Sequence, residues 1–195
     1  ISTTLSDGQL STDVDVVFEI DEFGDIVNEI SLENASSSFV TMAFDSEERL
    51  VLAGSGGPST SDDLNAVLWI PASTKGGHLL FEFDLGGIDR IRGLSVAPNG
   101  DYLVAGTTDS NGVLARIAPD GTLRWARTDF LEENATNDSD DVWDVAVTPD
   151  GYIAIVGQET TYDNILDFFP RIRRQNFIVL LDSDGNLVWR NALGN

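Results

Sequence analysis

The sequence contains no cysteine, one histidine and one lysine, and each scarcity excludes a class of site. Without cysteine, disulfide bonds and thiolate catalysis are excluded. The single histidine, His78, has no second histidine and no cysteine to join it in a zinc or copper site. A Ser-His-Asp triad would have to use His78, and the sequence contains no Gly-x-Ser-x-Gly motif to supply its serine.

Long apolar runs and a helical period are also absent. No run of about 18 apolar residues occurs, so we expect no membrane-spanning helix. No segment repeats its apolar residues with the helical period of 3.6, which argues against helices. Apolar residues make up 42% of the 195 residues, which is ordinary for a globular protein with one core. The chain begins at Ile1 rather than Met, which predicts a segment of a longer polypeptide.

Basic residues are few, with 11 against 33 acidic residues and a formal net charge of −22. Such a surface repels nucleic acids and anionic membranes, so we expect neither as a partner. Repulsion among the carboxylates costs stability at low salt. This excess of acidic residues with a single lysine resembles the composition of proteins from salty habitats. The alternative is an acidic secreted protein kept soluble by its charge. Three triplets match the glycosylation pattern and favour an extracellular or cell-surface protein, beginning at Asn34, Asn134 and Asn137.

One pattern occurs three times. Residues 94–106 read LSVAPNGDYLVAG, residues 144–157 read DVAVTPDGYIAIVG, and residues 40–54 read VTMAFDSEERLVLAG, with Ser-Glu-Glu where the turn should be. Each copy has alternating apolar residues and a second apolar run that closes on a glycine. The closing glycines are 52 (106−54) and 51 (157−106) residues apart. A period of this size, with two strands and a turn per copy, is typical of repeat architectures.

The second half of each unit has its own signature. An aromatic residue stands four positions after a turn glycine in three units, at Phe81, Trp125 and Trp189. We expect these aromatics to pack each unit against the next. An exposed aromatic ring that binds sugars is the alternative. Each unit therefore reads as four antiparallel strands.

The fold expected from these units is all-β, a β-propeller-like array of four-stranded antiparallel blades with about three and a half blades in this chain. The expected parts are an N-terminal loop, a half blade of two strands, and three blades, the last with a long insertion at 158–175: residues 1–12, 13–32, 38–86, 90–130 and 141–193. The half blade lacks its first two strands. We therefore expect a larger propeller, or self-association through edge strands, to complete it.

Four segments carry a family resemblance. The segments APNGDYLVAG and TPDGYIAIVG, with LARIAPDGTLRWAR and IVLLDSDGNLVWRNALG after them, resemble bacterial and archaeal β-propeller repeats. The resemblance covers residues 13–193 and is to surface and secreted propellers, distantly similar to quinoprotein-type propellers. It implies a propeller fold, which occurs in scaffolds, binding modules and enzymes alike. The pocket residues and calcium ligands of the quinone-cofactor enzymes have no counterpart that we can place here, so no catalytic residue is carried over.

The insertion holds the candidate partner site. Three of the eleven basic residues lie within four positions there, beside two phenylalanines: Phe168, Phe169, Arg171, Arg173 and Arg174. Arginine and aromatic residues anchor protein interfaces, which favours a protein partner at this stretch. The alternative is that these arginines pair with acids of their own molecule.

Two aspartate-rich stretches are candidate calcium sites. Asp138, Asp140 and Asp141 could hold Ca²⁺ through their carboxylates, and a solvated linker is the favoured alternative. Residues 182–186, DSDGN, resemble the beginning of a calcium loop but lack its further ligands. We therefore expect a hairpin turn at 182–186, where Asp-Gly supplies the positive φ. No other cofactor is expected.

Arg92 and Trp143 stand at corresponding positions on the first strands of two units, where they could face a central channel. The whole pattern favours a non-enzymatic extracellular β-propeller scaffold or protein-binding module, or a part of a larger assembly or filament. The alternatives are a fragment of a propeller enzyme, either a hydrolase or a quinoprotein-like dehydrogenase, and a carbohydrate-binding propeller.

Overall fold

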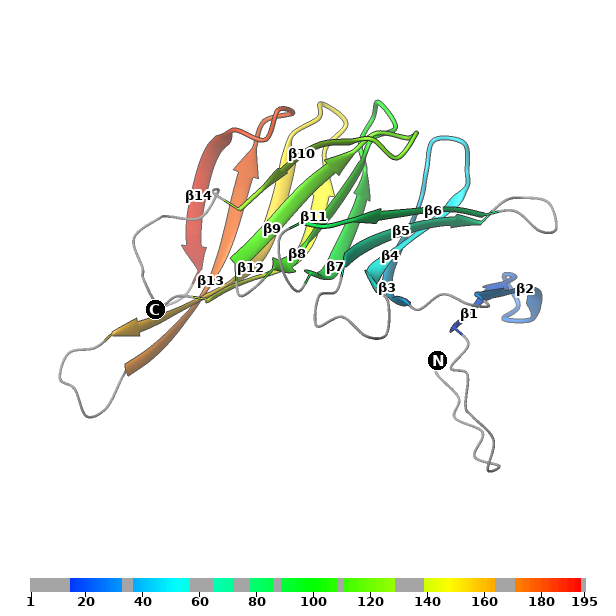
Figure 1. The fold of residues 1–195 in the computed structure, drawn as a ribbon, viewed down its shortest axis with the longest axis horizontal. Coiled ribbons are helices and arrows are strands. Elements are labelled where there is room, and N and C mark those ends of the chain that lie inside the picture. Colours follow the sequence, from blue (N-terminus) through cyan, green and yellow to red (C-terminus); the bar gives the residue numbers. More distant parts are fainter. Residues whose placement is uncertain are drawn as a thin grey trace.

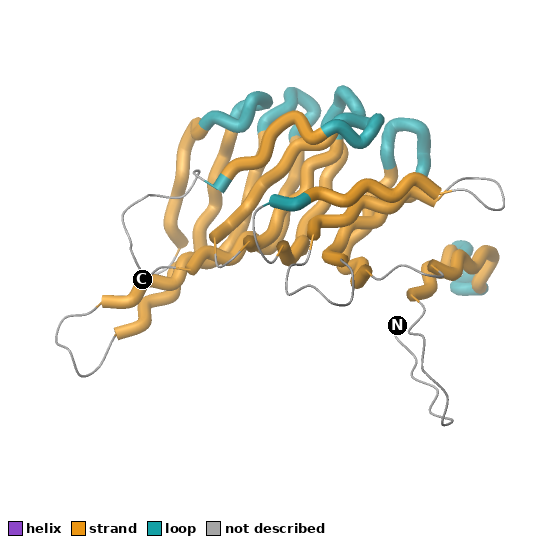
Figure 2. Tube along the Cα trace, in the orientation of Figure 1, coloured by secondary structure: helices purple, strands orange, loops and turns teal. Residues whose placement is uncertain are grey.

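The computed structural model describes residues 15–32, 37–56, 65–71, 78–85, 89–108, 111–128, 139–163 and 171–193. This part of the chain consists of strands joined by turns, with no helix, as Figures 1 and 2 show. The prediction of an all-β fold is therefore confirmed. No helix in these ranges is long and apolar enough to cross a membrane.

The strands form one two-stranded and three four-stranded sheets, all antiparallel, and each sheet follows the order of the sequence. The N-terminal hairpin contains β1 (Asp15–Ile20) and β2 (Ile26–Leu32). Sheet I contains β3 (Ser37–Phe44), β4 (Leu50–Gly56), β5 (Asn65–Pro71) and β6 (His78–Phe83). Sheet II contains β7 (Asp89–Val96), β8 (Tyr102–Thr108), β9 (Asn111–Ile117) and β10 (Leu123–Arg127). Sheet III contains β11 (Ser139–Val147), β12 (Ile153–Asp163), β13 (Arg171–Leu181) and β14 (Leu187–Leu193).

Alternation along the strands places the core between the sheets. Neighbouring residues of a strand point to opposite faces of its sheet. In β8, Leu103 and Ala105 belong to the cluster between sheets II and III, whereas Tyr102 and Val104 belong to the cluster between sheets I and II. All four are fully buried, and each large apolar side chain contributes roughly 1.5–3 kcal/mol on burial. Sheet II is therefore the middle layer of a stack of sheets.

The turn between the first and second strands is the same in all three sheets, although its sequence is not. In sheets II and III a glycine holds the positive φ, at Gly100 (85°) and Gly151 (87°). In sheet I this position is Glu48, with φ of 59°. Its amide donates to the Asp45 carbonyl oxygen at 3.0 Å, as the Gly100 amide donates to that of Ala97 at 2.8 Å. Flanking strands thus impose this turn on a sequence that does not favour it.

The segment predicted to be a long insertion, 158–175, is strand rather than loop at residues 158–163 and 171–175. β12 and β13 are 11 residues long each and stay in register from Ile153↔Leu181 to Asp163↔Arg171. The outer three pairs, Thr161↔Arg173 to Asp163↔Arg171, extend beyond β11 and β14 as a two-stranded ribbon, which projects from the stack in Figure 1. It lacks apolar alternation because it covers no core, so the sequence resembles a loop. Residues 164–170 lie outside the described part, and β11 begins at Ser139, two residues before the predicted start.

The N-terminal hairpin packs on the outer face of sheet I, where Val17 and Ile30 cover Leu52. The pairing register of β1 with β2 corresponds to that of the third and fourth strands of sheets II and III. The pair Ile20↔Ile26 is followed by a one-residue bulge, as are Ile117↔Leu123 in sheet II and Leu181↔Leu187 in sheet III. The hairpin thus pairs in the same way as the third and fourth strands of sheets II and III.

Candidate binding site at the first strands

The first strands of the three sheets lie side by side, with β7 in contact with both β3 and β11. The approach of β7 to β11 is close because Gly93 has no side chain. A Cβ at Gly93 would lie 2.8 Å from the Asp144 Cα atom and 2.9 Å from the Val145 nitrogen. Backbone therefore packs on backbone at this edge of the stack, which places residues of three sheets on one surface.

Each first strand has a bulge at the same place. In β7 the pairs Ile91↔Gly106 and Gly93↔Ala105 leave Arg92 without a partner in the ladder. The same shift in β3 and β11 leaves Val40 and Trp143 without a ladder partner. Arg92 and Trp143 therefore do occupy equivalent positions, and Val40 is the third member. We call these three residues the bulge row.

The bulges explain two of the closing glycines. A Cβ at Gly106 would lie 2.0 Å from the Arg90 carbonyl oxygen, and one at Gly157 would lie 2.2 Å from that of Asp141. Side chains cannot fit opposite the bulge at that distance. The repeated glycine and the bulge are thus one feature of the backbone, repeated in each sheet.

The bulge row is exposed in all three sheets. The exposed fraction is 58% for Val40 and 39% for Trp143, and 44% for the Arg92 side chain. A bulge changes the direction in which a side chain points. Because these side chains point to solvent, packing in the core does not determine which residue stands there. An apolar, a cationic and an aromatic side chain therefore occupy one surface on equivalent backbone.

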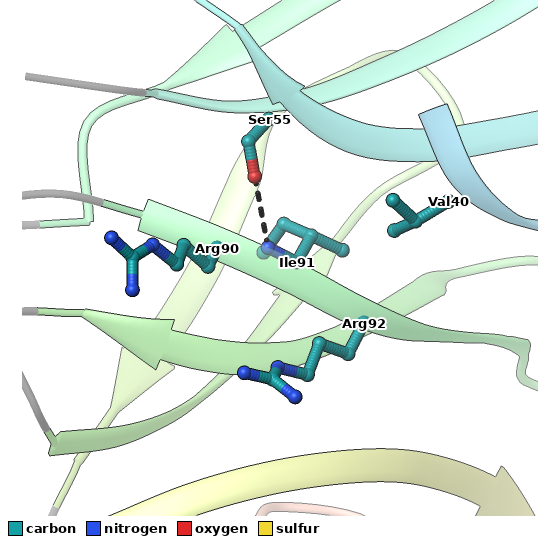
Figure 3. Close-up of a pocket in the computed structure, with 5 residues that line it drawn as sticks. All are labelled: Val40, Ser55, Arg90, Ile91 and Arg92. Carbon is teal, nitrogen blue, oxygen red and sulfur yellow. Dashed lines mark hydrogen bonds between the residues drawn. The ribbon is translucent and has the colours of Figure 1, made fainter. Parts of the chain in front are cut away.

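A cavity of about 400 Å³ opens between sheets I and II beside this row. Its lining is Val40, Ser55, Arg90, Ile91 and Arg92 (Figure 3). The Ser55 Oγ atom accepts a hydrogen bond from the Ile91 amide at 3.0 Å, which joins β4 to β7. Figure 3 shows the guanidinium groups of Arg90 and Arg92 pointing the same way in the view, away from Val40. The cavity thus combines an apolar wall with two cations.

The charges at this site are only partly neutralised. The Arg92 Nη2 atom lies 3.6 Å from the Asp141 Oδ1 atom, which also accepts a hydrogen bond from the Thr107 hydroxyl at 3.0 Å. Both partners of the ion pair are about half exposed, so the pair contributes little stability. Arg90 is exposed and forms no ion pair within the described ranges. Asp144 also reaches this edge, because its Oδ1 atom lies 3.0 Å from where a Cβ at Gly93 would be, so arginines and carboxylates are mixed at the site.

A second polar cluster, around Asp101, is structural. The Asp101 Oδ2 atom accepts from Arg116 Nε at 2.7 Å, from Arg124 Nε at 2.8 Å and from Asn99 Nδ2 at 2.9 Å. Burial raises the pKa of Asp101, but these hydrogen bonds outweigh it and hold the pKa below its usual value. Arg116 also donates to the Ser183 carbonyl oxygen, so the cluster ties sheet II to a turn of sheet III.

Asp45 has the corresponding role in the turn of sheet I. Its Oδ1 atom accepts from the amides of Glu47 and Arg49 at 2.9 Å, and its Oδ2 atom forms an ion pair with Arg49 at 2.7 Å. Burial opposes ionisation of Asp45, yet the hydrogen bonds from Arg49 and Glu47 lower its pKa overall. The Tyr102 hydroxyl lies 3.4 Å from Oδ2, and burial together with the Asp45 charge raises the pKa of Tyr102.

The candidate calcium residues do not converge within the described ranges. Asp138 lies outside them, and Asp140 and Asp141 are neighbours on β11, whose side chains point to opposite faces. No group of three or more acidic or histidine side chains there is placed to hold a metal ion. Residues 182–186 form the expected turn, in which the Asp182 Oδ1 atom accepts from the amides of Asp184 and Asn186.

The candidate partner site is described only in part. Phe168 and Phe169 lie outside the described residues, and Arg171 is the first residue of β13. Arg173 and Arg174 are exposed on the projecting ribbon of β12 and β13. The ribbon is distant in the sheet from the bulge row, because the bulge of β11 pairs with the inner half of β12. The structure thus does not bring the two arginine-containing sites together.

The repeated aromatics pack between sheets where a further sheet follows. Phe81 joins the cluster between sheets I and II, and Trp125 joins the one between sheets II and III. Trp189, on the outer sheet, is exposed. The first two therefore contribute to packing rather than to an exposed ring of aromatics. His78 lies in β6 opposite Pro71, and its side chain falls outside what the structure describes. The asparagines of the three glycosylation triplets, Asn34, Asn134 and Asn137, also lie outside the described residues.

Sequence reasoning missed Val40, Ser55 and Arg90. A signal for the first was available, because Val40, Arg92 and Trp143 each stand 14 residues before a closing glycine (54−40, 106−92 and 157−143). Ser55 follows such a glycine directly, as Thr107 does. Arg90 has no signal of its own apart from its place beside the bulge.

No known protein-family model matches the chain. No curated protein sequence resembles it significantly either. The function must therefore be inferred from the site itself.

Proposed function

We propose that the chain is a non-enzymatic β-propeller segment that binds an acidic segment of another protein across its first strands. Three features support a propeller arrangement. The sheets have four antiparallel strands in sequence order, they stack face to face, and their first strands adjoin at one edge. A stack of this kind, continued around an axis, has the architecture of a propeller, with first strands at the centre.

The observation that carries the proposed function is the bulge row. Equivalent backbone presents valine, arginine and tryptophan to solvent, at Val40, Arg92 and Trp143. Positions that build the fold are alike between units, as the glycines at 106 and 157 are, whereas this exposed position differs in each. Side chains that vary on a rigid and repeated frame are suited to recognition rather than to packing.

The chemistry of the site favours a carboxylate next to an apolar side chain. Arg90 and Arg92 supply cationic donors that match carboxylates in geometry. Val40 and Trp143 supply exposed apolar surface at the equivalent positions of the neighbouring sheets. On a chain of charge −22, a surface with two arginines close together is where an acidic partner meets less repulsion than elsewhere.

The proposed setting is the outside of the cell or its surface, as a scaffold or part of a larger assembly. The acidic composition, which keeps such a protein soluble, and the absence of cysteine are compatible with this setting. The projecting ribbon, with Arg173 and Arg174 exposed, offers a second basic surface for a partner. Self-association by pairing of edge strands also stays a prediction.

A peptide titration tests the proposed site. The probe is a set of synthetic peptides with two aspartates beside a leucine or phenylalanine, together with versions that carry asparagine in place of aspartate. We expect the aspartate peptides to change the fluorescence of Trp143 and the asparagine peptides to have no effect. The double variant Arg90→Gln/Arg92→Gln should weaken binding at least about tenfold, because charge-assisted hydrogen bonds to carboxylates are lost.

The matched control is Arg173→Gln/Arg174→Gln, which removes the same charge from the ribbon. Binding that both double variants weaken equally would reduce the effect to net charge and would contradict the proposed site. Failure of every aspartate peptide to bind would contradict it as well.

A further inference from the structure

The contact between consecutive sheets has a recurring element, an aromatic ring of one sheet lying over a turn glycine of the next. Phe81 of sheet I lies over Gly121 of sheet II, with ring atoms 2.2 Å from where a Cβ would be. Trp125 of sheet II lies over Gly185 of sheet III, at 3.1 Å. Both glycines have positive φ, 85° and 83°. Glycine is thus required twice at each contact, by the turn and by the ring above it.

Arginines of sheet II strengthen the second of these contacts. Arg127 Nη1 donates to the Gly185 carbonyl oxygen at 2.7 Å, and Arg116 donates to that of Ser183 in the same turn. The turn between the third and fourth strands is therefore the part of a sheet that receives the preceding sheet, through its glycine and its carbonyl oxygens.

Sheet III carries the ring of this contact with no sheet over it. Trp189 stands four residues after Gly185, as Trp125 does after Gly121, and is 42% exposed. Val156, on β12 of the same sheet, is 37% exposed, whereas its equivalent in sheet II, Ala105, is fully buried against sheet III. The outer face of sheet III thus presents the surface that sheet II uses to bind its neighbour.

The N-terminal hairpin carries the other half of the contact, also uncovered. Gly24 has φ of 88°, and no heavy atom of the described residues lies within 4 Å of where its Cβ would be. Its turn has the hydrogen bonds of the Gly185 turn. The amide of Gly24 donates to the Asp21 carbonyl oxygen at 3.1 Å, as that of Gly185 donates to Asp182 at 3.0 Å.

The strand beside this turn also exposes the receiving face. Phe18 and Ile20 of β1 are exposed, and the register of the hairpins makes them equivalent to Ala115 and Ile117 of β9. Those two are buried in the cluster between sheets I and II, where they receive sheet I. On the opposite face, Val17 already covers sheet I. One face of the hairpin therefore packs on sheet I. The opposite face, which corresponds to the face of sheet II that packs against sheet I, is exposed.

We propose that the chain assembles head to tail, with the outer face of sheet III of one copy packed on the N-terminal hairpin of a second copy and Trp189 over Gly24. The occupant is a second copy because the two surfaces lie at opposite ends of the molecule in Figure 1. The interface continues the one that already joins sheets I, II and III. It is heterologous, so each copy keeps one surface of each kind, and assembly yields a ring or a filament.

This proposal rests on the packing between sheets and is independent of the proposed peptide site. Its first test is sedimentation of the full chain over a range of concentrations, in low and in molar NaCl. We expect association that strengthens with salt, because two copies of charge −22 repel each other until that charge is screened. Trp189→Ser should raise the dissociation constant at least about tenfold, as loss of a central aromatic anchor does.

Gly24→Asn tests the receiving surface. Asparagine tolerates positive φ, so the turn is kept, while its side chain occupies the place of the indole. We expect the same loss of association as with Trp189→Ser and an unchanged far-UV spectrum. The matched control is Ile172→Ser, which removes an exposed apolar side chain from the projecting ribbon and should leave association unchanged.

A monomer at every concentration and salt would overturn the proposal. Association that Ile172→Ser weakens and Trp189→Ser does not would overturn it too, in favour of the ribbon.

Discussion

Sheets II and III are built from the same repeat, yet sheet II is buried on both faces and sheet III on one. The second strand of sheet II contributes Leu103 and Ala105 to the core beyond it, and both are fully buried. The equivalent residues of sheet III are Ala154 and Val156, which face outward with Val156 exposed. The repeat thus encodes a layer of a stack, and the burial of a given side chain depends on whether the next layer is present.

The largest expected effect of this difference is on stability, and it is measured by comparing Leu103→Ala with Val156→Ala. The first leaves a cavity between sheets II and III and should lower the free energy of unfolding by about 2–5 kcal/mol. The second removes a partly exposed side chain and should cost under about 1 kcal/mol. Urea unfolding followed by tryptophan fluorescence measures both. Equal losses would show that sheet III is as well covered as sheet II.

The polar contact between the two sheets gives the next test. Asp101→Asn removes the carboxylate that holds Arg116 and Arg124, and we expect a loss of about 2–3 kcal/mol at neutral pH. The folded pKa of Asp101 is lowered, so its contribution is present above the unfolded value near 3.8 and is lost as the pH falls below it. Wild type should therefore lose stability on acidification below that pH faster than the variant does. Parallel acid-induced losses would contradict this role.

Salt should affect the whole stack. Screening of carboxylate repulsion should raise the melting temperature by several degrees between millimolar and molar NaCl. Calorimetry at fixed protein concentration measures this, and dilution separates the effect from that of assembly. A melting temperature that is flat or falls with salt would remove the argument for adaptation to a salty habitat.

The smallest expected effect compares the turn of sheet I with that of sheet II. Glu48→Gly should stabilise the protein by roughly 0.5–1 kcal/mol, because glycine takes the positive φ without strain. Gly100→Ala should destabilise it by a similar amount. If Glu48→Gly is neutral or destabilising in thermal unfolding, then a contact of the Glu48 side chain matters more than the turn.

Strands and turns were predictable wherever they belong to the core. Alternation of apolar residues marks β8 and β12, and Asp-Gly marks the turn at 182–186, because burial and positive φ each demand particular residues. The outer half of the β12–β13 ribbon was not predictable, since strands that cover nothing need no alternation. Glu48 was not predictable either, because its turn is imposed by neighbouring strands.

The candidate site was also predictable only in part. The equivalence of Arg92 and Trp143 was visible in the sequence, because both are counted from a glycine that the backbone requires. Their place on a bulge was not, since a bulge is a property of pairing between strands. The cavity beside Arg90 depends on the gap between two sheets, about which the period of a sequence carries no information.

The two glycine contacts at opposite edges of a sheet also determine an angle. At the first strand, Gly93 lets β7 approach the backbone of β11, whereas at the fourth strand the indole of Trp125 separates β10 from the Gly185 turn. Sheets II and III are therefore close together at their first strands and held apart at their fourth strands by the indole, so a wedge-shaped space separates them. The opening of that wedge is the angle between sheets II and III. A thinner or thicker side chain at position 125 would change this angle and leave the sheets themselves unaltered.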